Sequence, residues 1–459
     1  MYTIDFKKPI HVHFIAIGGI SMSGLAEILL KASFTISGSD SKKTNLTKKL
    51  EEMGAHIFYG QRAENITDDI DLVVYSAAIR EDNPELKEAR AQKLPVLTRA
   101  ELLGQIMKNY KTPVAISGTH GKTTTTSMIS QILLDADMDP TITVGGILKS
   151  INGNIKVGHS DYFITEACEY TNSFLSFFPK VGIILNIDAD HLDFFKDIDD
   201  IRESFKKFAN LIPEDGLLII NGDIEKYDYI IEGLKCKVIT VGSKPHNNYR
   251  AENIEFNDRA CATFDLMIDG KNTCSISLCV EGIHNVYNSL AAIAFAINYN
   301  IPVSNIQSGL MAFNGADRRF EYKGNLGGIT IIDDYAHHPS EITATLEAAK
   351  KYPHKRIVCV FQPHTYSRTK ALLKDFAKAL SAADLVVLAD IYAAREKNTF
   401  NISSEDLKNE IDKLGTRCYY FKTFDEIENF LLEKCIDDDL LITMGAGDVV
   451  NIGENLLGI

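Results

Sequence analysis

Short apolar runs alternate with helix-like patterns along most of the chain. Runs with the length and composition of buried strands occur at residues 11–17, 71–78, 162–167, 181–187, 217–222, 328–333, 356–361, 384–389 and 440–443. Many of them are followed by glycine or polar residues and then by a segment with the apolar spacing of an amphipathic helix. This alternation is typical of α/β proteins in which helices cover parallel sheets. We therefore predict an α/β fold.

The pattern changes between residues 260 and 280. There, apolar and polar residues alternate on both sides of Asp269-Gly270. Because Asp-Gly favours the tight turn of a two-stranded antiparallel hairpin, we predict a small β-hairpin within the α/β pattern.

The length of 459 residues predicts two to four domains. The net charge of −14 argues against a broad basic face for nucleic acid. The apolar run at the N-terminus is short, contains histidines and leads into glycines, so we expect neither a signal peptide nor a membrane span. The eight cysteines are scattered without a C-x-x-C pair, which favours reduced thiols in a cytoplasmic protein.

The segment AISGTHGKTTTT follows an apolar run and opens a helical pattern. Such a loop presents backbone N–H groups and the positive end of a helix dipole to an anion. The familiar Walker loop has four residues between its first glycine and the Gly-Lys pair, whereas here only Thr119 and His120 separate Gly118 from Gly121. Together with Lys122, Thr123 and Thr124, these residues predict a triphosphate site with magnesium near the Thr123 hydroxyl.

Two further residues stand at strand ends where a ligand of an open α/β sheet would lie. Glu166 ends the run YFITEA, and His191 follows VGIILNI within NIDADHLD. With Thr123 they could complete a magnesium–phosphate site, although magnesium prefers oxygen ligands. From the residues alone, the following acids are equally plausible ligands: Glu169, Asp188, Asp190 and Asp193.

The apolar runs and helical patterns fall into three α/β blocks, and the first, which opens with the run at residues 11–17, contains an incomplete dinucleotide fingerprint. It reads Gly19-x-Ser21-x-x-Gly24, with serine where the middle glycine should be. Because that glycine lets the backbone approach a pyrophosphate, its absence weakens an NAD interpretation without excluding another nucleotide diphosphate.

Polar clusters also follow apolar runs in the third block, which runs from about Glu321. DDYAHHP contains Tyr335 and His337, and FQPHTYSRT contains Arg368. Upstream, Arg318 and Arg319 form a pair suited to phosphate or carboxylate. Three such clusters are difficult to explain by structural roles alone.

Taken in order, motifs along nearly the whole chain resemble the Mur ligase family. They are IGGISMSGLA, SGSD, YSAAI, TRAELL, GTHGKTTT, EACEYTNSFL, NIDADHLD, GIHNVYN, GADRRFEY, DDYAHHP, FQPHTYSRT and MGAGDV. The family's ATP loop has this shortened form. The resemblance implies a Rossmann-like UDP-substrate domain (1–108), a central ATP-binding domain (109–320) and a Rossmann-like C-terminal ligase domain (321–459).

The resemblance also implies an activity. We expect ATP-dependent joining of L-alanine to the lactyl carboxylate of UDP-N-acetylmuramate through an acyl phosphate, in peptidoglycan synthesis, by a monomer or weak homodimer that binds no nucleic acid. Cofactors would be ATP and Mg²⁺. The residues implied in catalysis are Lys122, His191, His337 and Arg368. Those implied for the nucleotide are Gly118 to Thr124, Asn285, Asn288 and Arg319; for the metal, Thr123, Glu166 and His191. Those implied for the substrate are Gly19, Ser21, Ser76, Arg99, Arg318, Tyr335, His337 and Arg368.

The sequence departs from the family pattern in places. Ile20 replaces a common glycine, Tyr170 and Asn172 replace a usual serine and aspartate, and Thr365 replaces an arginine found in some members. Lys206 and Lys207 lie near the position of a carbamylated lysine in sibling ligases, but neither is assigned.

Two alternatives to this activity stay open. One is a sibling recycling ligase that adds a whole murein peptide to the same sugar nucleotide. The other is a non-catalytic protein that binds nucleotide, which would have no use for the third-block clusters. An NAD dehydrogenase is disfavoured by Ser21.

Overall fold

The structure is a computed structural model that describes residues 2–76, 78–192, 194–394 and 396–459. The chain forms two compact units, the first of residues 1–186 and 202–239 and the second of residues 187–201 and 240–459. Within the described residues, the strands form three sheets, as the alternating pattern predicts. The domain boundaries proposed at 108/109 and 320/321 stay predictions.

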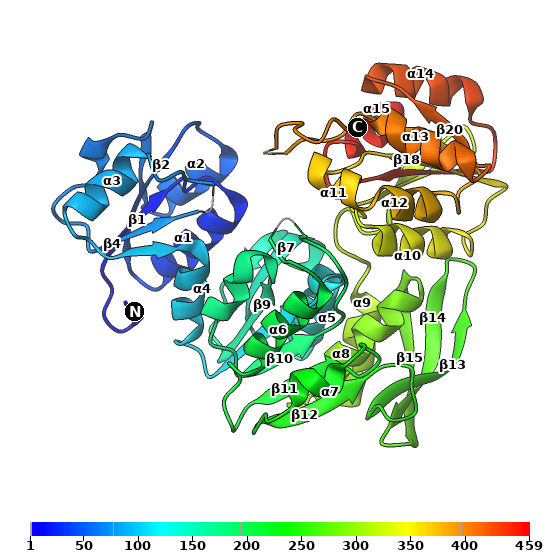
Figure 1. The fold of residues 1–459 in the computed structure, drawn as a ribbon. Helices are drawn as coiled ribbons and strands as arrows, with labels where there is room; N and C mark the ends of the chain where they lie inside the picture. The colour runs from blue at the N-terminus through cyan, green and yellow to red at the C-terminus, as the bar shows by residue number, and fades with distance from the viewer. Residues whose placement is uncertain (1, 77, 193, 395) are drawn as a thin grey trace. The chain divides into compact units, whose positions relative to one another are not determined.

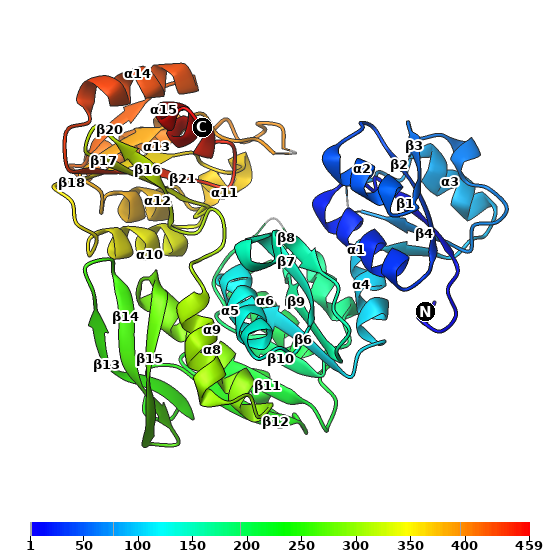
Figure 2. The same cartoon turned by 180° about the vertical axis from the view of Figure 1, so that it is seen from behind.

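The first sheet is parallel, with strand order β3-β2-β1-β4-β5. Helices α1 and α2 cover one face and α3 covers the other (Figures 1 and 2). Leu86 and Ala89 of α3 pack against Ile15 and Val73 of the sheet. The strands are β1 (His11–Ile15), β2 (Thr35–Asp40), β3 (His56–Tyr59), β4 (Leu72–Tyr75) and β5 (Val96–Thr98). The helices are α1 (Ile20–Lys31), α2 (Asn45–Glu52), α3 (Pro84–Ala91) and α4 (Arg99–Met107).

The central sheet places β6 between β9 and β10, with both pairs parallel. The sheet has ten strands: seven of them have the order β12-β11-β10-β6-β9-β7-β8, and the three strands of the hairpin region described below continue it beyond β12. Because parallel strands end at the same edge, the loops after β6, β9 and β10 meet there. The strands are β6 (Thr112–Ser117), β7 (Thr141–Leu148), β8 (Gly153–Lys156), β9 (Tyr162–Ala167), β10 (Val181–Ile184), β11 (Leu217–Asn221) and β12 (Lys237–Val241). The helices are α5 (Lys122–Asp135), α6 (Ile198–Ala209) and α7 (Tyr227–Ile231).

The predicted hairpin is confirmed. β14 (Cys261–Ile268) and β15 (Lys271–Glu281) are antiparallel, and β13 (Tyr249–Phe256) pairs with β14 on the other side. The turn residues Asp269 and Gly270 both have positive φ, 47° and 77°, as the Asp-Gly turn requires. Helices α8 (Ile283–Asn298) and α9 (Val303–Ala312) follow.

The C-terminal sheet has strand order β16-β17-β21-β18-β19-β20 and is parallel except for β16. It lies between two layers of helices, with α10 and α12 on one face and α14 and α15 on the other (Figures 1 and 2). The strands are β16 (Glu321–Leu326), β17 (Ile329–Asp334), β18 (Arg356–Phe361), β19 (Leu385–Leu388), β20 (Arg417–Tyr420) and β21 (Asp439–Met444). The helices are α10 (Pro339–Ala349), α11 (Tyr366–Ala371), α12 (Leu373–Leu380), α13 (Ser404–Lys413), α14 (Phe424–Lys434) and α15 (Val450–Leu457).

Several strands are shorter than their apolar runs. The predicted strand 71–78 is β4, Leu72–Tyr75, and the predicted strand 181–187 is β10, Val181–Ile184. In the second case the remaining residues form a loop beside the phosphate-binding segment. No helix built from the described residues is long and apolar enough to cross a bilayer.

Candidate active site

The loop between β6 and α5 has the geometry of an anion cradle. Gly118 and Gly121 adopt φ values of 142° and 83°, which favour glycine. A Cβ added at Gly118 would lie 3.0 Å from Cβ of Leu185, so the loop packs closely against the end of β10. Helix α5 begins at Lys122 without a side-chain cap, which leaves its first-turn N–H groups to an anion. The loop therefore fits a phosphate group.

Lys122 lies folded over this loop. Its ammonium donates to the carbonyl oxygens of Gly118 and Thr119 and to Oε2 of Glu169, 3.1 Å away. The Lys122 side chain is 16% exposed and that of Glu169 only 2%. Although burial acts to lower it, the pKa of Lys122 is raised, because the Glu169 carboxylate and other nearby negative charge outweigh desolvation. Lys122 is thus charged, and its three acceptors hold it at the loop.

Asn186, at the end of the run VGIILN, braces the loop from the neighbouring strand. Its Oδ1 accepts from the His120 N–H at 2.7 Å, and its Nδ2 donates to the His120 carbonyl at 3.0 Å. The Thr119 N–H donates to the backbone carbonyl of Asn186. Sequence reasoning missed this residue. The available signal was an amide side chain directly after a buried strand.

Two of the predicted metal ligands lie against the same short segment of β7. A Cβ added at Gly145 would lie 2.9 Å from Oε2 of Glu166, and one added at Gly146 would lie 3.4 Å from Cγ2 of Thr123. Glu166 also accepts from the Gly145 N–H at 2.6 Å. Across the described residues, no three His, Cys, Asp or Glu side chains are grouped to hold a metal ion. A hydroxyl and a carboxylate fit magnesium only if phosphate and water supply its other oxygen ligands.

A cavity of about 190 Å³ in the first unit brings together residues from distant predicted motifs. Ser21, Arg99, Glu166 and Cys168 are among the residues that line it. The Arg99 guanidinium has no hydrogen-bond or ion-pair partner within the described part of the chain, and burial lowers its pKa. A partly buried guanidinium in this state is suited to an anionic ligand.

Other predicted substrate contacts have local roles. Gly19 is the N-cap of α1, and Ser76 accepts from the Ala78 N–H at 3.3 Å. Asp40 accepts from the Gly18 N–H at 2.8 Å, so it closes the first glycine turn.

A second polar cluster, formed within the second unit, centres on Arg368. Its guanidinium donates to both carboxylate oxygens of Asp190, at 3.0 and 3.3 Å, and to Nδ1 of His364 at 3.2 Å. Although burial acts to raise it, the pKa of Asp190 lies well below its ordinary value, because Arg368 and neighbouring histidines favour the carboxylate. His191 follows with φ of 54°, its Nε2 3.8 Å from Asp190.

His337 is a neutral imidazole in this cluster. Its Nδ1 lies 3.0 Å from the Tyr335 carbonyl, and its ring stands edge-on to that of His364. Burial, opposed by Glu341 and reinforced by the charge of Arg368, lowers the pKa of His337 to about 4. Because a neutral ring donates from Nδ1 to a carbonyl, the lone pair is on Nε2, where it can accept a proton.

The predicted arginine pair divides into two roles. Arg318 donates to Asp333 and to the carbonyls of Gly447 and Gly445, at 2.9, 2.9 and 2.7 Å. Arg319 makes one long ion pair, 3.8 Å from Glu341. The Arg319 guanidinium therefore has more donors to offer a ligand.

The remaining predicted residues are also placed. Asn285 and Asn288 lie on α8, where Asn288 donates to Asn285 at 3.0 Å. Asp188 accepts from Ser340 at 3.4 Å. Asp193, one of the alternative metal ligands, lies outside the described residues.

Comparison with known proteins extends over the whole chain. Residues 11–111 match the model of the Mur ligase family catalytic domain, residues 116–296 the Mur ligase middle domain, and residues 318–447 the glutamate ligase domain of Mur ligases. The UDP-N-acetylmuramate–L-alanine ligase of Agathobacter rectalis is 61% identical over 457 residues, with 100% of both chains covered. That of Lachnospira eligens is 59% identical over 458 residues, again with both chains covered fully.

Solved structures that resemble this chain are ligases of the same kind. The UDP-N-acetylmuramate–alanine ligase of Thermotoga maritima is 30% identical, with a TM-score of 0.80 and 98% of each chain covered. A murein peptide ligase of Psychrobacter arcticus is 25% identical over the same share, with a TM-score of 0.70. With such matches in all three parts of the sequence, the chain belongs to the Mur ligase family.

Proposed function

We propose that this chain joins L-alanine to the lactyl carboxylate of UDP-N-acetylmuramate with hydrolysis of ATP to ADP and phosphate. The curated relatives that match it at full length carry the name of that activity. The observation that carries the proposal is that an anion cradle with a partly buried, charged Lys122 lies close to a cavity lined by Glu166 and by Arg99, whose guanidinium has no partner among the described residues. An enzyme that activates a carboxylate with ATP needs these groups together.

Activation of the carboxylate requires two anions to approach each other. Repulsion between unit charges about 4 Å apart is about 4 kcal/mol at an effective dielectric constant of about 20. Lys122 and the N-terminus of α5 would offset it at the phosphates, and Arg99 would offset it on the substrate side. We assign Gly118 to Thr124 to the ATP phosphates. Magnesium, held by Thr123 and Glu166, would neutralise further charge on the phosphates.

In the second unit, we assign the proton transfer from the alanine amine to His337. A neutral imidazole with Nε2 as acceptor is suited to general-base work. Arg319, Asn285 and Asn288 would contact the nucleotide. Tyr335 and Arg368 would face the amino acid or the carboxylate, and Arg368 holds Asp190 and His364 in position for this.

Phosphate release in the presence of UDP-N-acetylmuramate tests the proposal. With ATP and magnesium, release should require an amino acid and be fastest with L-alanine among L-alanine, L-serine and glycine. Amide formation should match phosphate release mole for mole.

Two further arms of the same assay address the alternatives. Turnover with a murein tripeptide but not with L-alanine would overturn the proposal in favour of a recycling ligase. Nucleotide binding without phosphate release under any combination would favour a non-catalytic binding protein. The higher TM-score of the alanine ligase structure, 0.80 against 0.70 for the murein peptide ligase, supports the alanine enzyme.

A cytoplasmic location and a monomeric or weakly dimeric state are part of this proposal. All eight cysteines are free thiols, which accords with a reducing compartment.

A further inference from the structure

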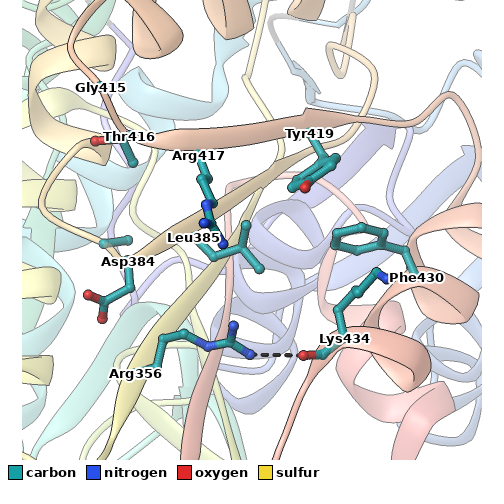
Figure 3. A pocket seen from close by; sticks show the side chains of 10 residues that line it. Arg356, Asp384, Leu385, Gly415, Thr416, Arg417, Tyr419, Phe430 and Lys434 are labelled. Carbon is teal, nitrogen blue, oxygen red and sulfur yellow. Dashed lines mark hydrogen bonds between the residues drawn. The ribbon is translucent and has the colours of Figure 1, made fainter.

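A separate cavity lies at the amino-terminal ends of the strands of the C-terminal sheet. His337 and Arg368 follow the carboxyl-terminal ends of those strands. The cavity has a volume of about 400 Å³ and opens among the amino-terminal ends of β18, β19 and β20 and helix α14 (Figure 3). The polar cluster follows the carboxyl-terminal end of β18, six residues further along. At about 3.3 Å per residue, the two places are roughly 20 Å apart. A ligand in this cavity would therefore not touch the reacting groups.

Cationic side chains dominate the lining. The Arg356 guanidinium is fixed by Asp439, at 3.1 and 2.6 Å, and by the Lys434 carbonyl at 2.9 Å. The guanidinium of Arg417 and the ammonium of Lys434 have no hydrogen bond or ion pair with any described residue. Asp384 contributes one carboxylate, whose Oδ2 accepts from the Ile357 N–H at 2.8 Å. Among the residues that line the cavity, three cations thus accompany one carboxylate, in a chain whose net charge is −14.

One wall of the cavity is aromatic. Tyr419 is 40% exposed, and its ring centroid lies 4.6 Å from that of Phe430. Figure 3 shows Arg417 and Arg356 projecting into the same space, with the two rings along one side and Asp384 on the other. An exposed ring beside cations offers a surface for a flat group attached to an anion.

We propose that this cavity binds a nucleoside monophosphate. The phosphate lies between Arg417 and Lys434, which are its only partnerless cations in the described structure. The base stacks on Tyr419, and a ribose hydroxyl donates to Asp384. The volume of about 400 Å³ is within the range of small-molecule sites. The site is independent of the ligase chemistry.

A single tryptophan reports on this cavity alone. The chain contains no tryptophan, so in Tyr419→Trp all indole emission comes from the aromatic wall. Titration of this otherwise intact variant with AMP should change the emission saturably, with half-saturation at about 1 mM or below. An emission that stays constant through the titration would overturn the proposal.

The cations and the base are tested in the same background. Arg417→Ala with Lys434→Ala should weaken AMP binding at least about tenfold, because each loses a charge-assisted hydrogen bond. Lys374→Ala, an exposed lysine of α12, is the matched control and should leave the titration unchanged. Because Arg417 and Lys434 are both exposed, their replacement should not alter the fold, and circular dichroism checks this.

Two further probes separate the parts of the ligand. Adenosine and inorganic phosphate should each bind at least about tenfold more weakly than AMP. Adenosine as effective as AMP would overturn the role of the cations. Inorganic phosphate as effective as AMP would overturn the role of the aromatic wall.

Discussion

At the scale of single residues, Lys122 is the side chain on which the proposed chemistry most depends. Lys122→Ala should reduce phosphate release at least about 100-fold, because the transferring phosphate loses its fixed cation, while binding of UDP-N-acetylmuramate persists. Coupled ADP detection measures the first quantity, and calorimetric titration of the sugar nucleotide measures the second. Lys111→Ala, which removes an exposed lysine of the same unit, is the control. Undiminished turnover in the Lys122 variant would refute the assignment.

The same substitution also removes the cation that pairs with buried Glu169. We therefore expect Lys122→Ala to be less stable than the wild type, as breaking a buried pair is costly. Adding Glu169→Gln should recover part of the stability without recovering turnover. A double variant that regains both would show that Lys122 acts only through folding.

Two adjacent histidines should respond differently to substitution. His337→Gln should lower kcat by about 100-fold or more with little change in Tm, because it removes the Nε2 acceptor. His338 is instead the N-cap of α10, where its side chain accepts from Ser340. His338→Ala should cost about 1 kcal/mol of stability, measured by urea unfolding. Equal effects of both changes on kcat would contradict a specific role for His337.

At the scale of elements, the phosphate loop depends on the strand beside it. Asn186→Ala removes both hydrogen bonds to His120 and should raise the KM for ATP at least about tenfold, because the loop loses its fixed shape. Asn221→Ala is the control, since Asn221 donates to the neighbouring Leu185 carbonyl and makes no bond to the loop. ATP titrations of both variants at saturating sugar nucleotide give the comparison. An unchanged KM would show that the phosphate loop keeps its shape without the hydrogen bonds of Asn186.

The junction of β15 and α8 should give the protein a pH-dependent stability. Burial raises the pKa of Glu281 to about 7. Because this folded-state value exceeds the unfolded value of 4.5, the protonated carboxyl stabilises the fold at low pH, and this contribution is lost as pH rises from about 4.5 to 7. Glu281→Gln should therefore gain stability over the wild type through that range, by at most about 3 kcal/mol.

Urea unfolding at several pH values measures this difference. Glu255→Gln, an exposed position of β13, reports what loss of a carboxylate in the same ribbon does by itself. A difference between Glu281→Gln and the wild type that is constant with pH would contradict the prediction.

The elements that sequence reasoning found were those with a strong local signal. The phosphate loop and the Asp269-Gly270 hairpin follow from glycine geometry and strand alternation. Strands such as β16 (EYKGNL) were missed, because an edge strand needs few apolar residues and therefore lacks a clear apolar pattern. The pairing of Lys122 with Glu169 and the contacts of Asn186 with the phosphate loop could not be read from the motifs either. Those contacts depend on strand order, which places β9 and β10 on either side of β6.

At the scale of the whole molecule, the three-sheet α/β architecture followed from the alternation of runs and helices. The path of the chain between units did not. It passes from the first unit to the second at 186/187, returns at 201/202 and passes again at 239/240. Composition and periodicity contain no signal for such a path, because residues 187–201 are grouped with the second unit by contacts with residues far along the chain.

Those contacts make the segment 187–201 a test of how the second unit is held together. Arg368 binds Asp190 through both carboxylate oxygens, and Ser340 donates to Asp188. Arg368→Gln should raise amide hydrogen exchange in residues 187–201 at least about tenfold, because a buried charge-assisted pair is lost, while exchange in β6 and α5 stays unchanged. Lys370→Gln, an exposed position on the same helix α11, should change neither region. Amide exchange in residues 187–201 that does not change in Arg368→Gln would show that other contacts hold this segment. The role of Arg368 would then be limited to binding a ligand.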